Sequence, residues 1–149
     1  MGKKVKAVPD GYSTATPYLV VKGAAKAIDF YKKAFGAQEL YRMPGPNGTV
    51  AHADLIIGTS HLMLADKSDK GDAVKGASSS VFLYVENVDA IARKAIAAGA
   101  KETAPVQDMF WGDRYGKLLD PFGNEWQIAT HIEDVSPQEM EKRMAAAHS

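Results

Sequence analysis

A chain of 149 residues is the size of one ordinary domain and can bury a hydrophobic core without disulfides or metals. Its 18 basic and 18 acidic residues balance, so no overall charge favours nucleic acid or an anionic membrane as a partner. The absence of cysteine excludes disulfides, zinc–thiolate sites, iron–sulfur clusters and thiol nucleophiles. No secretion signal and no bilayer-spanning segment is recognisable, so we expect a cytoplasmic protein with no membrane partner.

The first apolar segment, at residues 18–21, is rich in β-branched side chains and predicts a strand. Apolar residues then recur at the spacing of one helix face, and Gly36 follows as a C-cap. This face consists of Ala24, Ala27, Ile28, Tyr31 and Phe35. Three further strands, separated by turns rich in Gly, Pro and Asn, are predicted at residues 38–43, 50–57 and 61–65.

The second half of the chain repeats this pattern. A strand is predicted at residues 81–85, and Asn87 can cap a helix that ends at Gly99. Three more strands are predicted at residues 101–107, 114–119 and 125–130. The sequence therefore predicts two β-α-β-β-β modules in a single domain, at residues 14–66 and 79–131, joined by a polar linker at 67–78.

A third helix is predicted near the end of the chain. Ser136 and Glu139 form a capping box, with Pro137 at the first helical position. The helix is expected at about 136–147, and docking on the surface of its own chain is favoured over binding to a partner. The expected fold class is α+β, with mixed sheets of four strands that cup into one barrel-like cavity.

Three motifs stand out in these modules, AIDFYKKAFG at 27–36, FWGDRYG at 110–116 and DPFGNEW at 120–126. They resemble the vicinal oxygen chelate superfamily, the glyoxalase/bleomycin resistance protein/dioxygenase family. The second motif, the sequence ATH at 129–131 and the C-terminal helix resemble the PhnB-like branch. The resemblance implies the glyoxalase fold, and it implies a homodimer because dimers are common in this family.

The resemblance also implies where a divalent metal would be held, at four positions on the first and fourth strands of the modules. These positions are Thr16, Met63, Ser80 and Gln127, none of which is a histidine or a carboxylate. We therefore expect no metal cofactor. The alternative is a divalent ion at an atypical site that includes His52. His52 and Asp54 share one strand face, but His61 is too far along the ladder to share an ion with His52.

Strand alternation and the resemblance together predict which residues line a ligand pocket. Six are expected to face inward, and Trp111 and Arg114 are expected at the pocket mouth, where the guanidinium can bind an anionic or planar group. The alternative is that these side chains only pack the sheet interior. The six inward-facing residues are Thr16, Tyr18, Met63, Ser80, Phe82 and Gln127.

His52 is the candidate catalytic residue, as a general base oriented by Asp54. The alternative is a half-exposed histidine hydrogen-bonded within a strand. His61, after a tight turn, is expected to be solvated, whereas His131 and His148 have no visible partner. Trp126, on the face opposite Gln127, is expected in the core.

The function that these features favour is metal-independent binding of a small aromatic or amphipathic molecule. One alternative is an enzyme of the lyase, isomerase or thiol-transfer type, which would use an atypical metal site or His52 as acid and base. A second alternative is a structural module with a filled core and no ligand. The expected partners are a small-molecule ligand and a second copy of the chain, with no nucleic acid.

Overall fold

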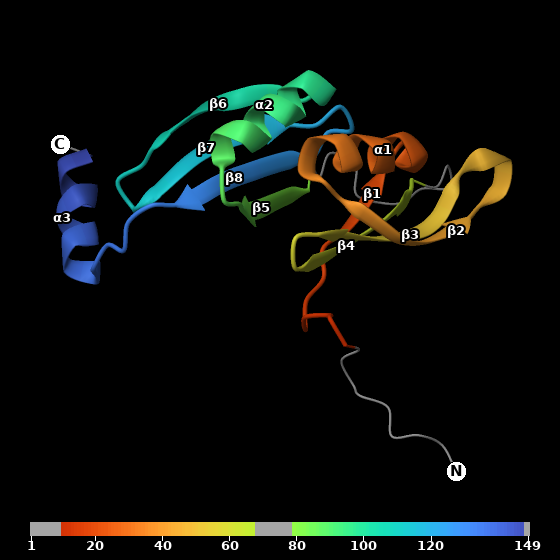
Figure 1. Cartoon of the computed structure of the whole chain (residues 1–149), viewed down its shortest axis with the longest axis horizontal. Coiled ribbons are helices and arrows are strands. Elements are labelled where there is room, and N and C mark those ends of the chain that lie inside the picture. Colours follow the sequence, from red (N-terminus) through yellow and green to blue (C-terminus); the bar gives the residue numbers. More distant parts are fainter. Residues whose placement is uncertain (1–9, 68–78, 148–149) are drawn as a thin grey trace, which may run out of the picture. The chain divides into compact units, whose positions relative to one another are not determined.

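The computed structural model describes residues 10–67 and 79–147. The chain divides into two compact units, Met1–Ala77 and Ser78–Ser149. Each unit contains a four-stranded sheet with a helix across one face (Figure 1). Of the predicted linker, Lys67 alone is described, and His148 lies outside the described residues.

The first unit is one β-α-β-β-β module. Its sheet has the strand order β1-β4-β3-β2, in which β1 and β4 are parallel and the other neighbours are antiparallel. The crossover through the helix makes the parallel pair possible. In chain order the elements are β1 (Tyr18–Val21), α1 (Ala24–Phe35), β2 (Gln38–Pro44), the 3-10 turn η1 (Pro46–Gly48), β3 (Val50–Ile57) and β4 (Ser60–Asp66).

The second unit repeats this topology and adds a helix. Its strand order is β5-β8-β7-β6, again with one parallel pair, between β5 and β8. In chain order the elements are β5 (Ser80–Tyr84), α2 (Val88–Ala98), β6 (Lys101–Asp108), β7 (Asp113–Leu119), β8 (Glu125–His131) and α3 (Pro137–Ala147). Arg143 of α3 donates hydrogen bonds to the Phe110 carbonyl and the Glu133 carboxylate, which ties α3 to its own unit.

Both sheet-packed helices are anchored by a side chain at the end of the last strand of their own module. Asp66 in β4 accepts hydrogen bonds from the backbone N–H groups of Gly23 and Ala24, each at 2.9 Å. Thr130 in β8 accepts one from the backbone N–H of Val88, also at 2.9 Å. The first N–H groups of a helix lack internal partners, so these bonds stabilise each helix start. The repeat thus extends to the anchoring of the helices.

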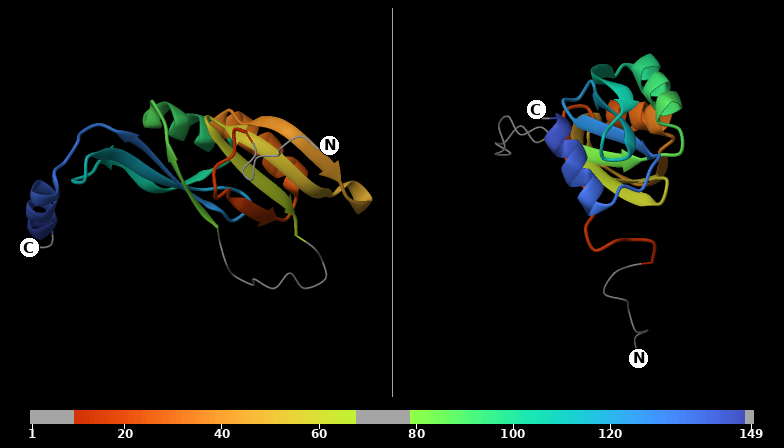
Figure 2. Two further views of the ribbon diagram at one scale, coloured as in Figure 1. Left: turned by 90° about the horizontal axis from the view of Figure 1, so that it is seen from below. Right: turned by 90° about the vertical axis from the view of Figure 1, so that its left-hand side faces the viewer.

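Alternation along the strands decides which face of each sheet is buried. In β1, Leu19 and Val21 are 2% exposed, whereas Tyr18 and Val20 are 47% and 49% exposed. The helix of each unit lies across one face of its sheet (Figure 2). Both helices carry buried residues of their own, so we assign the buried side chains of the strands to the face that the helix covers. The other face of each sheet, which we call the open face, carries aromatic and polar residues.

The predicted fold class is confirmed. The structure is α+β, with two mixed sheets in β-α-β-β-β modules and a C-terminal helix. Trp126 is fully buried, as predicted for a core residue. Within residues 10–67 and 79–147, no helix combines the length and apolar character that crossing a membrane requires.

Candidate functional site

A row of cross-strand neighbours crosses the open face of the first sheet. Tyr18 pairs with Met63, Met63 with Asp54, and Asp54 with Tyr41. Directly opposed residues share one face of a sheet, so the predicted pocket residues Tyr18 and Met63 lie together here. Thr16 lies just before β1.

His52 stands beside this row but is not oriented by Asp54, so that prediction is wrong. Its Nδ1 lies 3.2 Å from the hydroxyl of Tyr18. Its ring lies between Tyr18 and Tyr41, with centroid distances of 5.6 and 6.4 Å. The Asp54 carboxylate is engaged elsewhere, by His61 and Tyr12. A general-base role for His52 stays a prediction. In that role its ring would be oriented by the hydroxyl of Tyr18.

The expectation that His61 is solvated is also wrong. Its side chain is 7% exposed, and its Nδ1 lies 2.9 Å from an oxygen of Asp54. The ring of Tyr12 stacks on the imidazole with a centroid distance of 3.6 Å. His61 pairs with Ile56, which places it on the open face next to Asp54. Tyr12 comes from the segment before β1, which no local pattern connects to β4.

In the second unit, polar groups form a chain of hydrogen bonds along the open face. The hydroxyl of Tyr115 donates to the side-chain oxygen of Gln127 at 2.6 Å. The amide nitrogen of Gln127 donates to the hydroxyl of Ser80 at 3.2 Å, and Ser80 donates to Glu125 at 3.1 Å. Ser80 and Gln127, predicted as ligand contacts, are therefore brought together and held in fixed orientations.

Aromatic rings lie alongside this polar chain and form what we call the aromatic face. Phe82 lies 4.9 Å from Tyr84 and 5.9 Å from Tyr115 between ring centroids. Trp111 meets Tyr115 edge to face at 5.4 Å. Such contacts hold rings in defined orientations. The predicted residues Phe82 and Trp111 thus belong to one cluster of rings with Tyr84 and Tyr115, in which Phe82 and Tyr84 are exposed and Tyr115 is buried.

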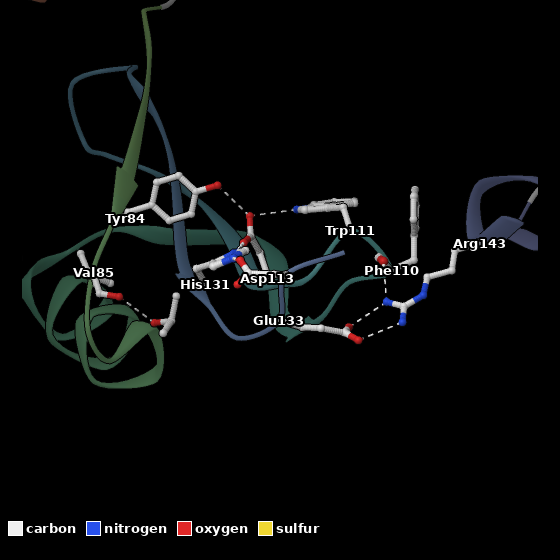
Figure 3. Close-up of polar contacts among 10 residues, drawn as sticks. Tyr84, Val85, Phe110, Trp111, Asp113, His131, Glu133 and Arg143 are labelled. Atoms are coloured by element: carbon white, nitrogen blue, oxygen red, sulfur yellow. Dashed lines mark hydrogen bonds and ion pairs between the residues drawn. The ribbon is translucent and has the colours of Figure 1, made fainter. Parts of the chain in front are cut away.

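Asp113, which sequence reasoning did not select, organises one end of the aromatic face (Figure 3). It is 2% exposed and accepts hydrogen bonds from the hydroxyl of Tyr84 and the indole N–H of Trp111, each at 3.0 Å. Its other oxygen lies 2.9 Å from Nδ1 of His131. The bond to Asp113 raises the pKa of Tyr84. The signal was present in the motif at 110–116, where an acidic residue directly follows a tryptophan and a glycine.

His131 is not without a partner, contrary to expectation. Its ring nitrogens contact Asp113 and Asp134, and these bonds, chiefly the one to Asp113, raise the pKa of His131 above its ordinary value of 6.5.

The raised pKa of His131 makes the stability of the fold depend on pH. The contribution of His131 is fully present below the pKa that it has in the unfolded chain, and it is lost as the pH rises through the folded-state pKa. The free energy of unfolding of the wild-type protein should therefore be higher than that of His131→Gln, and the difference should be largest at about pH 5.5. Urea unfolding from about pH 5.5 to 9 measures this difference. A difference that grows with pH would contradict a raised pKa of His131.

Arg114 is not brought to the aromatic face. Its guanidinium bonds Asp89 of α2 at 2.8 and 3.0 Å, and Asp108 of β6 at 3.0 Å. These carboxylates hold the pKa of Arg114 above its ordinary value, so the group stays charged and paired. Asp89 belongs to the helix, so Arg114 lies on the helix side of its sheet, one residue out of phase with Asp113 and Tyr115.

The four positions at which the resemblance implies metal ligands do not fit a divalent metal. Thr16 and Ser80 offer hydroxyls, Met63 a thioether and Gln127 an amide, all neutral and weak ligands for such ions. The Ser80 hydroxyl and the Gln127 amide also bond each other. In the part of the chain that the structure describes, no three His, Cys, Asp or Glu side chains gather as a metal-binding group.

Known proteins are similar to this chain in sequence and in structure. Uncharacterized protein Rv0887c of Mycobacterium tuberculosis is 40% identical over 139 residues, which span 88% of this chain and 82% of that protein. The crystal structure of TioX from Micromonospora sp. ML1 is similar with a TM-score of 0.68 and 29% identity, over 80% of this chain and 99% of that one. A PhnB protein from Bacillus cereus, described as a putative 3-demethylubiquinone-9 3-methyltransferase, shares the fold with a TM-score of 0.59 and 22% identity, over 79% of this chain and 99% of that one.

A family model agrees with these likenesses and with the motifs at 27–36, 110–116 and 120–126. The model described as Glyoxalase/Bleomycin resistance protein/Dioxygenase superfamily matches residues 13–128, which include most of both modules. The chain therefore belongs to the glyoxalase/bleomycin resistance protein/dioxygenase superfamily, which is the vicinal oxygen chelate superfamily.

Proposed function

We propose that the protein binds a small amphipathic molecule with an aromatic ring on an open sheet face, without a metal ion. The observation that carries this proposal is the aromatic face of the second unit. Phe82 and Tyr84 are 41% and 64% exposed, although large apolar side chains are normally buried. A contiguous exposed apolar patch rimmed by polar groups is typical of a binding surface.

The aromatic face offers two kinds of contact. Phe82 and Trp111 present ring surface on which a flat ligand can stack. The Gln127 amide donates one N–H to Ser80, and its oxygen accepts a hydrogen bond from Tyr115. The second N–H of the amide can donate to a ligand oxygen. Stacking would supply most of the affinity, and the held amide would fix the orientation of the ligand.

The open face of the first sheet supports the same kind of contact. Tyr18 is 47% exposed, and with Met63 it presents a ring and a polarizable thioether on one row. We propose both as ligand contacts on that sheet, with Thr16 before β1 as a further polar group. The homodimer and the cytoplasmic location stay predictions.

The proposal is tested with 8-anilinonaphthalene-1-sulfonate, an amphipathic dye of two aromatic groups. We expect saturable binding that quenches Trp111 by energy transfer. Phe82→Ser should weaken binding about tenfold or more, because the ring contributes roughly 1.5–3 kcal/mol of apolar burial. Fluorescence titration of the dye into the two proteins measures the effect.

Ile96→Ser is the matched control. Ile96 is 43% exposed, close to the 41% of Phe82, but it lies on α2 and not on the open face. The control should bind the dye as wild type does. Equal losses in the two variants would contradict a site on the aromatic face, and an absence of saturable binding would favour the structural-module alternative.

A further inference from the structure

A second site is suggested by Tyr12, which lies in the segment before β1. Its hydroxyl donates a hydrogen bond to one oxygen of Asp54. Its ring stacks on the imidazole of His61, with a centroid distance of 3.6 Å and an angle of 21° between the planes. On the open face of the first sheet, the phenol ring of Tyr12 is thus held by one hydrogen bond and one stacking contact.

The groups that receive this phenol are built into adjacent strands. Asp54 belongs to β3 and His61 to β4, and the side chain of each is 7% exposed. The bond of 2.9 Å between Nδ1 of His61 and one carboxylate oxygen fixes the plane of the imidazole. The second oxygen of Asp54 faces Tyr12. A hydrogen-bond acceptor and a flat ring are therefore held together, which is the arrangement that a hydroxylated aromatic ring requires.

The segment that carries Tyr12 is held much less firmly than the site it fills. Residues 10–16 form neither helix nor strand, and most of them are exposed. A segment with few buried contacts opens at low free-energy cost compared with a sheet. A free phenol could make the same hydrogen bond and the same stacking contact, so it would compete directly with Tyr12.

We propose that Asp54 and His61 form a binding subsite for the hydroxyl-bearing ring of a phenol, and that Tyr12 fills this subsite as an internal competitor which a ligand must displace. The site differs from the aromatic face of the second unit and does not depend on it. The bond to Asp54 is the largest cause of a raised pKa of Tyr12. A raised pKa means that the carboxylate of Asp54 favours a neutral phenol over a phenolate.

The test uses 4-methylphenol, which has the structure of the tyrosine side chain. We expect it to bind Tyr12→Ala at least tenfold more tightly than wild type, as measured by chemical shifts of the 15N-labelled protein. Toluene and 4-methylanisole lack the hydroxyl donor and should bind Tyr12→Ala at least tenfold more weakly than 4-methylphenol. Equal binding of the three compounds would show that they fill the apolar space left by the substitution without a hydrogen bond to Asp54, and this would overturn the proposal.

Wild-type protein supplies a second measurement that does not depend on how the variant folds. Saturating 4-methylphenol should release the segment, so the amides of Gly11, Tyr12 and Ser13 should shift and exchange hydrogen faster. Toluene should leave them unchanged. If 4-methylphenol leaves these amides unchanged in wild type, Tyr12 is a fixed part of the core and the proposal fails. The dye titration of Phe82→Ser would be unaffected by that failure.

Discussion

Replacing Asp120 with alanine is expected to lower the free energy of unfolding by about 3–5 kcal/mol, because each buried donor left unpaired costs about 1–3 kcal/mol. Asp120 is 3% exposed. It accepts hydrogen bonds from the backbone N–H groups of Phe122 and Asn124 at 2.8 and 2.9 Å, and from the indole N–H of Trp126 at 2.9 Å. Trp126 is fully buried and cannot turn to water for a new partner.

Urea unfolding followed by tryptophan fluorescence measures this loss. The two tryptophans of the chain, Trp111 and Trp126, both belong to the second unit, so their emission reports that unit. Asp134→Ala is the control, because the Asp134 side chain is fully exposed, and it should change stability far less. An equal loss in the two variants would show that the bonds to Asp120 do not hold the turn between β7 and β8.

The second large effect is expected at Gly112, just before Asp113. Its φ of +102° is unfavourable for other residues, and an added Cβ would lie 2.2 Å from the carbonyl oxygen of Glu133. That carbonyl belongs to the backbone and cannot rotate away as a side chain would. Gly112→Ala should therefore cost about 2–4 kcal/mol, from backbone strain and overpacking together.

Gly123→Ala separates these two causes. Gly123 has a φ of +90°, but nothing lies within 4 Å of its added Cβ. Gly123→Ala should lower the free energy of unfolding only by the cost of the backbone conformation, about 1–2 kcal/mol. Thermal unfolding of both variants gives the comparison. If Gly123→Ala is as destabilised as Gly112→Ala, close packing against Glu133 is not what requires glycine at 112.

The repeated module could be predicted from the sequence because its signals are local. The helical spacing of apolar residues between Ala24 and Phe35 predicted the face of α1 that is buried, and the glycines after each helix marked the helix ends. Strand alternation brought Tyr18 together with Met63, and Ser80 with Gln127, on open faces. These predictions needed the side-chain period of a strand, the equivalence of the two modules and the register that the family resemblance implies.

The polar partners could not be predicted, because they join residues far apart in the chain. Tyr12 reaches Asp54 across 42 positions, and Tyr84 reaches Asp113 across 29. Arg114 is different, because a local rule is enough to place it. Adjacent strand residues point to opposite faces, so Arg114 cannot share a face with Asp113 and Tyr115.

The central claim, binding to an open sheet face without metal, is tested most directly by the affinity for 8-anilinonaphthalene-1-sulfonate before and after metal removal. The protein is purified without an affinity metal and titrated in EDTA, then titrated again with Ni²⁺ or Zn²⁺ in excess of the chelator. We expect the same dissociation constant in both conditions, because Phe82 and Trp111 supply the contacts. Binding that is lost in EDTA and restored by either ion would contradict the account.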